Sequence, residues 1–231
     1  MKIIEVKNLH KVYHETEVET RAVNGVNLQF EEGEFTAVVG PSGSGKTTLL
    51  NIIGGLDKPT EGEVLIDNVL IHNLSPSKLI DFRMKYIGFV FQSYNLIPVL
   101  TAGENVEFIM HLQGRPKIER QKRTKELLAA VGLSERINSR PGKLSGGQQQ
   151  RVAVARALAS KPRFVLADEP TANLDSKSTE NLLEIMETLN REENVSFIFS
   201  THDARVVNKA RRVITIEDGK VISDEVKPGN K

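Results

Sequence analysis

The chain has 231 residues, of which 39% are apolar and 26% charged, with a formal net charge of +1 and no cysteine. These values are typical of one globular domain, exclude disulfides and thiolate metal sites, and give no global electrostatic case for binding nucleic acid. No apolar run approaches the roughly 18 residues of a spanning helix, and Met1–His10 shows no signal-peptide core, so we expect a cytosolic chain that does not cross a membrane by itself.

The first third of the chain contains several short strands. Between the first two lies a charged segment, His14–Arg21, which we expect to be an exposed hairpin tip or loop. Asp67-Asn68 is predicted to be the turn of a short hairpin. Short β-branched segments bounded by turn residues indicate the strands, at Ile3–Val6, Val26–Phe30, Phe35–Val39, Glu63–Ile66 and Val69–Ile71.

A glycine-rich segment follows the strand at Phe35–Val39 and matches the phosphate-binding pattern G-x-x-x-x-G-K-[ST]. Apolar residues recur at helical spacing from Leu49 to Leu56, so the segment joins a strand to a helix, as the pattern requires. A Gly/Ser-rich linker is the alternative, which the flanking elements disfavour. We expect Lys46 to reach the β- and γ-phosphates and Thr47 to bind Mg²⁺. The predicted nucleotide-binding residues of this loop are Gly40, Pro41, Ser42, Gly43, Ser44, Gly45, Lys46, Thr47 and Thr48.

The middle of the chain is predicted to be helical. A strand at Ile87–Phe91 ends at Gln92, and Thr101-x-x-Glu104 is a capping box that starts the first helix. A basic helix follows Pro116, and we expect its Lys and Arg residues to form a solvated face. These basic residues are Lys117, Arg120, Lys122, Arg123 and Lys125, and Leu127, Leu128 and Val131 are expected to point inward.

Strand patterns return in the last third and alternate with a helix, which predicts right-handed crossovers and a mostly parallel sheet. Asp218-Gly219 is predicted to be a hairpin turn and Lys227–Lys231 a frayed tail. The strands are predicted at Arg163–Ala167, Val195–Phe199 and Arg212–Ile216, with the helix at Ser178–Asn190. The result is a parallel-sheet core interrupted by a helical insertion over residues 93–157.

Two acidic residues end the strand Phe164–Ala167. A carboxylate near Mg²⁺ at the end of a neighbouring strand is the second requirement of a P-loop enzyme, and Asp168 is the candidate. Glu169 is the candidate to polarise the attacking water, if a turn brings both carboxylates to one side. Its alternative is a solvated surface charge.

Leu144-Ser145-Gly146-Gly147-Gln148 starts a helix predicted over Gly147–Ala159. Ser145 and Gln148 form a capping box, and a well-capped helix start is the simple interpretation. Two glycines and a serine at a helix N-terminus also form an anion site. A second anion site, separate from the P-loop, indicates that it serves the nucleotide of a neighbouring subunit.

The P-loop at Gly40–Thr47, the segment Leu144–Gln148 and Asp168-Glu169, in this order, resemble ABC-type ATPases over nearly the whole chain. The resemblance implies an α/β fold: a P-loop NTPase (RecA-like) core with a mostly parallel sheet, an antiparallel β subdomain and an inserted α-helical subdomain. The chain is then a single ABC ATPase domain over 1–231. Residues 1–92 and 158–231 form the core with the β subdomain, and residues 93–157 form the helical subdomain.

The resemblance also implies residue roles. The signature of one subunit contacts the nucleotide on the P-loop of the other, so two ATP are held in a head-to-tail homodimer. The residues for this partner contact are Ser145, Gly146, Gly147, Gln148 and Asp175, the last from the D-loop Asn173-Leu174-Asp175. The catalytic residues are Glu169, His202, Lys46 and Gln92, and the Mg²⁺ ligands are Thr47, Gln92 and Asp168. Tyr13 matches the aromatic residue that stacks on adenine, although a core tyrosine has the same pattern.

Four further sequence segments resemble the MacB/LolD-type branch of this family, to which FtsE-like proteins are closely related. They are Asn51–Thr60, Asn95–Pro98, Glu104–Val106 and Leu144–Leu158. Two positions depart from that branch: Ala172 replaces a glycine, which is tolerable unless its φ is positive, and Glu107–Met110 replaces an apolar-Pro stretch.

This branch implies an ATP- and Mg²⁺-dependent subunit on the cytoplasmic side of the cell membrane, attached peripherally through an integral membrane permease. The work implied is peptide or drug efflux, lipoprotein release or, alternatively, FtsE-like control of cell-wall enzymes. Three other readings stay open. A DNA-repair or chromosome-structure ATPase would need a coiled-coil insertion or a basic surface, a translation-associated protein usually carries two ATPase units, and a small-molecule kinase would share only the P-loop.

Overall fold

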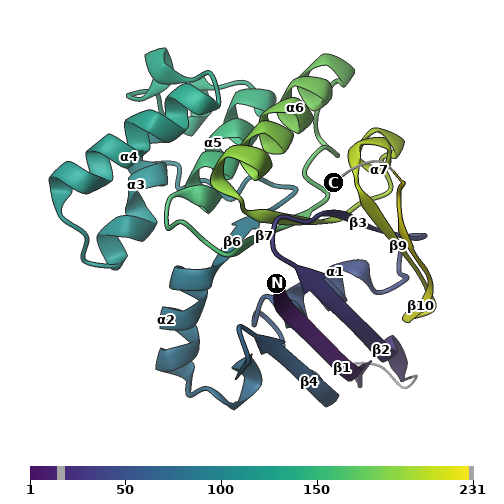
Figure 1. The fold of residues 1–231 in the computed structure, drawn as a ribbon. Coiled ribbons are helices and arrows are strands. Elements are labelled where there is room, and N and C mark those ends of the chain that lie inside the picture. The colour runs from purple at the N-terminus through teal and green to yellow at the C-terminus, as the bar shows by residue number, and fades with distance from the viewer. Residues whose placement is uncertain (15–18, 229–231) are drawn as a thin grey trace.

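The computed structural model of the chain describes residues 1–14 and 19–228, so parts of the predicted loop His14–Arg21 and of the predicted tail lie outside the described residues. Its strands form two sheets, with helices around them (Figure 1). A six-stranded sheet has the order β10-β9-β3-β8-β7-β6 and is parallel except for the β9–β10 hairpin. A four-stranded sheet has the order β2-β1-β4-β5 and is antiparallel. The predicted combination of a parallel core and extra antiparallel strands is confirmed.

The strands are β1 Lys2–Tyr13, β2 Thr20–Glu31, β3 Phe35–Val39, β4 Glu61–Ile66, β5 Val69–Leu70, β6 Ile87–Val90, β7 Phe164–Asp168, β8 Ser196–Ser200, β9 Arg212–Glu217 and β10 Lys220–Val226. The α-helices are α1 Lys46–Ile53, α2 Pro76–Tyr86, α3 Ala102–Leu112, α4 Lys117–Ala130, α5 Gly146–Leu158, α6 Ser176–Glu193 and α7 Ala204–Lys209. Short 3₁₀ turns lie at η1 Ile71–Asn73, η2 Ser134–Arg136 and η3 Pro141–Lys143.

Strands β1 and β2 are much longer than the sequence pattern predicts, at 12 residues each. Their pairing contains several register shifts, one of them between Val6 and Leu9, and Asn8 within this shift has a φ of +42°. A bulge adds a residue to one strand and so breaks the two-residue alternation by which a strand is recognised. The bulges therefore hide the outer half of each strand from the pattern.

Two helices, α2 and α7, are not predicted from the sequence. Only Phe82 is buried in α2, so the helix lacks the apolar stripe that reveals amphipathic helices. Its start does carry a signal, because Pro76 occupies the first turn directly after Ser75. Helix α7 is only 6 residues long and begins at the capping residue Asp203.

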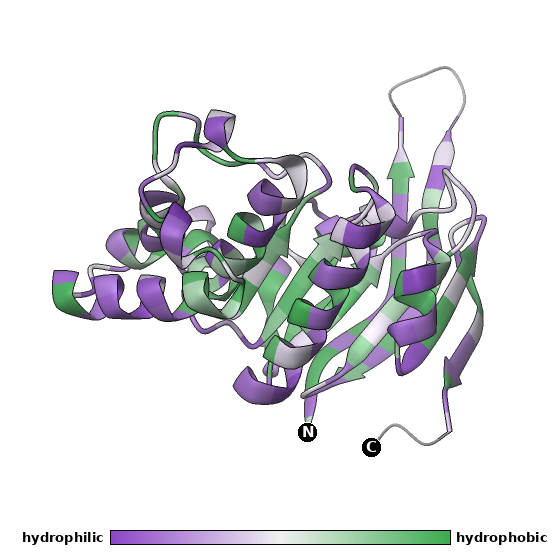
Figure 2. Cartoon of the chain, turned by 90° about the horizontal axis from the view of Figure 1, so that it is seen from above, coloured by the Kyte–Doolittle hydropathy of each residue, from purple (hydrophilic) through white to green (hydrophobic). Residues whose placement is uncertain are grey.

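The six-stranded sheet is buried on both faces. Along β7, Phe164 and Leu166 pack with the antiparallel sheet and α1, whereas Val165 and Ala167 pack with the helices α3–α6. Figure 2 shows the hydrophobic colour running along these strands and hydrophilic colour over much of the surrounding helices. Because both faces are buried, the sequences of these strands are continuous apolar runs rather than alternating apolar and polar residues.

Helix α4 confirms the predicted inward residues but corrects the prediction of a wholly solvated basic face. Arg123 is only 9% exposed. It binds both carboxylate oxygens of Glu193 on α6, at 2.7 and 2.9 Å, and also donates to the Leu158 carbonyl at 3.1 Å. This buried cation joins α4 to α5 and α6, and its distant partners explain why the linear charge pattern does not reveal it.

Candidate nucleotide site

The carboxyl ends of neighbouring parallel strands bring the predicted catalytic segments to one edge of the sheet. The P-loop follows β3, the pair Asp168-Glu169 ends β7, and Thr201-His202 follows β8. Because β3, β8 and β7 are adjacent and parallel, these loops lie together, which is the usual ligand position in such sheets. Gln92 follows β6, the next strand along.

Two P-loop glycines are required because the loop lies against other backbone. A Cβ on Gly40 (φ +151°) would lie 2.0 Å from the Ile216 carbonyl oxygen, and one on Gly45 (φ +100°) would lie 2.0 Å from the Ala22 carbonyl oxygen. Gly43 (φ +80°) differs, because a Cβ there would meet nothing within 4 Å. The loop is therefore fixed on one side and open on the other.

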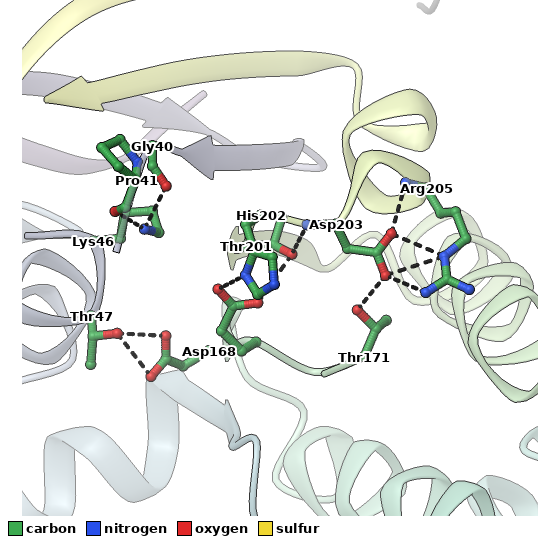
Figure 3. Close-up of polar contacts among 11 residues, drawn as sticks. Gly40, Pro41, Lys46, Thr47, Asp168, Thr171, Thr201, His202, Asp203 and Arg205 are labelled. Carbon is green, nitrogen blue, oxygen red and sulfur yellow. Dashed lines mark hydrogen bonds and ion pairs between the residues drawn. The ribbon is translucent and has the colours of Figure 1, made fainter. Parts of the chain in front are cut away.

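The cationic group of the loop is Lys46, whose side chain is largely buried at 7% exposure. Its Nζ donates to the carbonyl oxygens of Gly40 and Pro41, at 2.8 Å each (Figure 3). Among the described residues, the buried Ser44 hydroxyl has no hydrogen-bond partner. An ammonium, an unpaired hydroxyl and the free N–H groups of a helix start fit a phosphate group.

Thr47 and Asp168 are in direct contact although they are far apart in the sequence. Thr47 Oγ1 donates to Asp168 Oδ1 at 2.9 Å and lies 3.2 Å from Oδ2 (Figure 3). The described residues contain no cluster of three His, Cys, Asp or Glu side chains that could hold a metal. One hydroxyl and one carboxylate are hard oxygen ligands, and Mg²⁺ in nucleotide sites takes its remaining ligands from phosphate and water. The pair therefore fits magnesium bound together with a nucleotide.

Glu169 is directed toward His202 by an unusual backbone conformation. Its φ of +45° is left-handed, which costs a non-glycine residue roughly 1–2 kcal/mol. The conformation makes the turn that the sequence left open, and the Glu169 Oε1 atom lies 2.8 Å from His202 Nδ1. An ionised Glu169 can only accept, and the contact is then a hydrogen bond donated by Nδ1–H. Thr201 Oγ1 donates to Oε2 at 3.3 Å.

The sequence analysis did not predict three supporting residues, Thr171, Asp203 and Arg205. Asp203 Oδ2 accepts from Thr171 Oγ1 at 2.9 Å, which ties the segment after Glu169 to the segment after His202 (Figure 3). Arg205 binds the same carboxylate at 2.8 Å, and its hydrogen bonds lower the pKa of Asp203 to about 2. The carboxylate is thus ionised at all ordinary pH values. Its place at the N-cap of α7 was the available signal.

A cavity of 570 Å³ collects most of the predicted residues. It is lined by the P-loop, Gln92, Glu169, Ala172 and His202. Ala172 is not among the described residues with positive φ, so its methyl group is tolerated, as predicted. A larger hollow of 940 Å³ lies near the start of β3. Two of its cations pair with its acids, Arg212 with Glu34 and Lys209 with Glu187, and Arg211 donates to Asn190 Oδ1.

The signature residues lie apart from this cavity, and none of them lines it. Ser145 and Gln148 form the predicted capping box at the start of α5. Asp175 is likewise an N-cap, accepting from the Ser178 N–H at 2.9 Å. Tyr13 also lies outside the cavity lining; its hydroxyl donates to Asp57 Oδ2 at 2.8 Å, and Lys11 Nζ lies 4.8 Å from its ring centre.

Gly146 in the signature packs against Tyr94, and we predict that Gly146→Ala lowers the free energy of unfolding by about 1–3 kcal/mol through overpacking. A Cβ there would lie 2.8 Å from the Tyr94 hydroxyl but 3.8 Å from the ring carbon that bears it. Tyr94→Phe should therefore recover much of the loss, as measured by urea unfolding. Gly142→Ala is the control, because its Cβ would meet nothing within 4 Å. Equal losses at the two glycines, or no recovery with Phe, would contradict this packing.

The fold and this site together define a P-loop ATPase. The family model described as "ABC transporter" matches residues 23–172, more than half of the chain, and the chain belongs to this family. It is an ATP-binding and ATP-hydrolysing component of an ABC transporter, as the sequence motifs predict. No helix in the described ranges 1–14 and 19–228 is long and apolar enough to span a bilayer.

Several relatives are similar over nearly their whole length. The chain is 49% identical over 227 residues to the uncharacterized ABC transporter ATP-binding protein MJ0796 of Methanocaldococcus jannaschii, covering 97% of that protein. It is 48% identical over 220 residues to an uncharacterized ABC transporter ATP-binding protein of Thermotoga maritima, covering 94%. The macrolide export ATP-binding/permease protein MacB of Hyphomonas neptunium is 47% identical, but the chain covers 35% of it.

Solved structures of MJ0796 have the same fold. The dimeric structure of its post-hydrolysis state, bound to ADP and Pi, has a TM-score of 0.90 at 46% identity. A second dimeric structure of the same cassette also has a TM-score of 0.90, at 47% identity. Each comparison covers 99% of this chain and all of the matched chain.

Proposed function

We propose that two copies of the chain close head to tail around two ATP and drive a separate membrane permease. The observation that carries this proposal is the separation of the two anion-binding elements: the P-loop lines a cavity that none of Ser145–Gln148 reaches. In the proposed dimer each signature meets the P-loop cavity of the other copy. The relative MJ0796 is dimeric in two solved structures, one of them bound to ADP and Pi, which supports pairing of two copies.

In the proposed mechanism, Lys46 exchanges the carbonyl oxygens of Gly40 and Pro41 for the β- and γ-phosphates. Thr47, Asp168 and Gln92 would hold Mg²⁺, and the ion would supply positive charge beside the phosphates. Glu169 accepts a proton from the attacking water. His202 orients that carboxylate through the 2.8 Å contact and reaches the γ-phosphate once nucleotide is bound. Loss of the γ-phosphate then removes the shared contact, and the dimer opens.

We also propose that Tyr13 stacks on adenine, which requires only an accessible ring face. The whole chain, 1–231, then acts as one ATPase domain. Residues 1–92 and 158–231 carry the nucleotide, and residues 93–157 form the helical subdomain that moves with the signature.

The surface that meets the permease is proposed to lie at Gln92–Met110. A groove of 430 Å³ there is lined by residues of α3, α4 and the preceding loop, including Leu100, Glu104 and Phe108. Val99 and Phe108 leave 72% and 39% of their surface exposed. Apolar side chains exposed beside a groove are typical of protein contacts. The similarity to a macrolide export ATP-binding/permease protein, MacB, supports a membrane permease as the partner. The proposal extends to a permease of the MacB/LolD type, to peripheral attachment on the cytoplasmic side of the membrane, and to peptides, drugs or lipoproteins as the class of cargo.

The test is co-purification from membranes followed by mass spectrometry, with the Phe108→Ser variant. We expect this variant to lose the co-purifying permease by about thirtyfold while it still binds ATP, because removing an interface aromatic costs about 2 kcal/mol. Ile222→Ser is the control, since Ile222 is 58% exposed but lies on β10. Equal recovery of the permease with both variants would contradict the assignment of this surface.

A further inference from the structure

The loop that carries Gln92 is fastened by side chains of α5, the helix whose first turn holds the signature. Gln150 of α5 is fully buried. Its Nε2 donates to the Pro170 carbonyl at 2.7 Å and lies 3.4 Å from the Phe91 carbonyl oxygen. Phe91 directly precedes Gln92, and Pro170 directly follows Glu169. One side-chain amide therefore connects the backbones next to two predicted catalytic residues.

Further along α5, Arg156 holds the other side of the loop. Its guanidinium donates to the carbonyl oxygens of Tyr94, at 2.8 Å, and Asn95. Both residues are left-handed, with φ of +60° and +50°, which is unfavourable without glycine and persists only where the surroundings fix it. Because two successive residues share the left-handed backbone conformation, their carbonyl groups point in a similar direction. One planar guanidinium can therefore bind both carbonyl oxygens.

A third hydrogen bond fixes the backbone of Gln92 itself. Its carbonyl accepts from Asn173 Nδ2 at 3.1 Å, while the residue lines the 570 Å³ cavity. The main chain is thus held before, at and after Gln92. The side chain is exposed, so its position depends on this backbone rather than on packing of its own.

We propose that Gln150 and Arg156 are positioning residues for Gln92, which make the signature helix and the Gln92 loop move as one unit. This inference rests on the proposed function, in which the signature meets the partner's nucleotide. When the signature shifts to engage that nucleotide, α5 carries Gln92 with it through the carbonyls of Phe91, Tyr94 and Asn95. Occupancy of one site then sets the position of Gln92 in the other.

The test measures steady-state ATP hydrolysis by the full-length chain. For Gln150→Met, which keeps the side-chain length, we expect kcat to fall about tenfold and KM for ATP to change less than about twofold, because misplacing a catalytic group affects turnover more than binding. Gln149→Met is the matched control, since its side chain donates to the Leu144 carbonyl, two residues before the start of α5. It should hydrolyse ATP like the unaltered chain. Arg156→Lys should lower kcat in the same direction, because an ammonium lacks the planar fork.

The kcat of the double variant, with Gln150→Met added to Gln92→Ala, distinguishes a positioning role of Gln150 from a merely structural one. If Gln150 acts through Gln92, adding Gln150→Met to Gln92→Ala lowers kcat no further. Independent losses that multiply, or equal effects of Gln150→Met and Gln149→Met, would overturn the inference. Should Gln150→Met fail to fold in thermal melts, Arg156→Lys provides the same comparison. Absence of ATP hydrolysis by the unaltered chain would overturn the proposed function itself.

Discussion

Replacing Glu169 with Gln is expected to lower ATP turnover by a hundredfold to about ten-thousandfold, the usual contribution of a general base. The amide keeps the size of the side chain and leaves the P-loop untouched, so ATP binding should be unchanged. Because the γ-phosphate is no longer removed, the proposed dimer should accumulate. Gel filtration of the purified variant with ATP and Mg²⁺ would then show a dimer, and phosphate release would be nearly absent.

The matched control for this variant is Glu217→Gln, an exposed carboxylate at the end of β9. It should show the turnover and the monomer–dimer behaviour of the unaltered chain. If Glu169→Gln elutes only as a monomer with ATP, the head-to-tail dimer is wrong for this chain. If it instead retains turnover, the assignment of Glu169 as the base is wrong, and the left-handed turn at Glu169 has another reason.

Lys46→Ala is expected to weaken ATP binding by roughly 10- to 100-fold, since a hydrogen bond to a charged group contributes about 1.5–3 kcal/mol. The lysine already lies inside the P-loop, where it binds the Gly40 and Pro41 carbonyls. Removing it therefore takes away the cation that phosphate would meet. Calorimetric titration with ATP measures the loss directly.

Lys125→Ala, on the exposed side of α4, is the control for the change in net charge. A thermal melt shows whether the P-loop survives without the two lysine hydrogen bonds. Unchanged ATP affinity of a folded Lys46→Ala variant would contradict the assignment of this loop as the phosphate site.

The sequence predicts the elements of the fold best where local chemistry and tertiary contacts agree. The strand at Phe35–Val39 and the capping box at Thr101–Glu104 appear as predicted. Helix α2 was missed because it buries only Phe82 and thus has no apolar period. The outer parts of β1 and β2 were missed because bulges interrupt their alternation. Arg123 was assigned to a solvated face, since its partner Glu193 is 70 positions away.

The sequence alone determined the family of this protein and the predicted residues of its site. The spacing of Gly40, Gly45 and Lys46, the acidic pair at the end of β7 and the signature at Ser145–Gln148 each depend on residue type and local backbone, which the linear order contains. Only the tertiary structure decided how these groups meet. The contact of Thr47 with Asp168, the left-handed turn that directs Glu169 to His202, and the hold of Gln150 and Arg156 on the Gln92 loop depend on which parallel strands are neighbours. That order arises from long-range pairing and burial, and no local pattern encodes it.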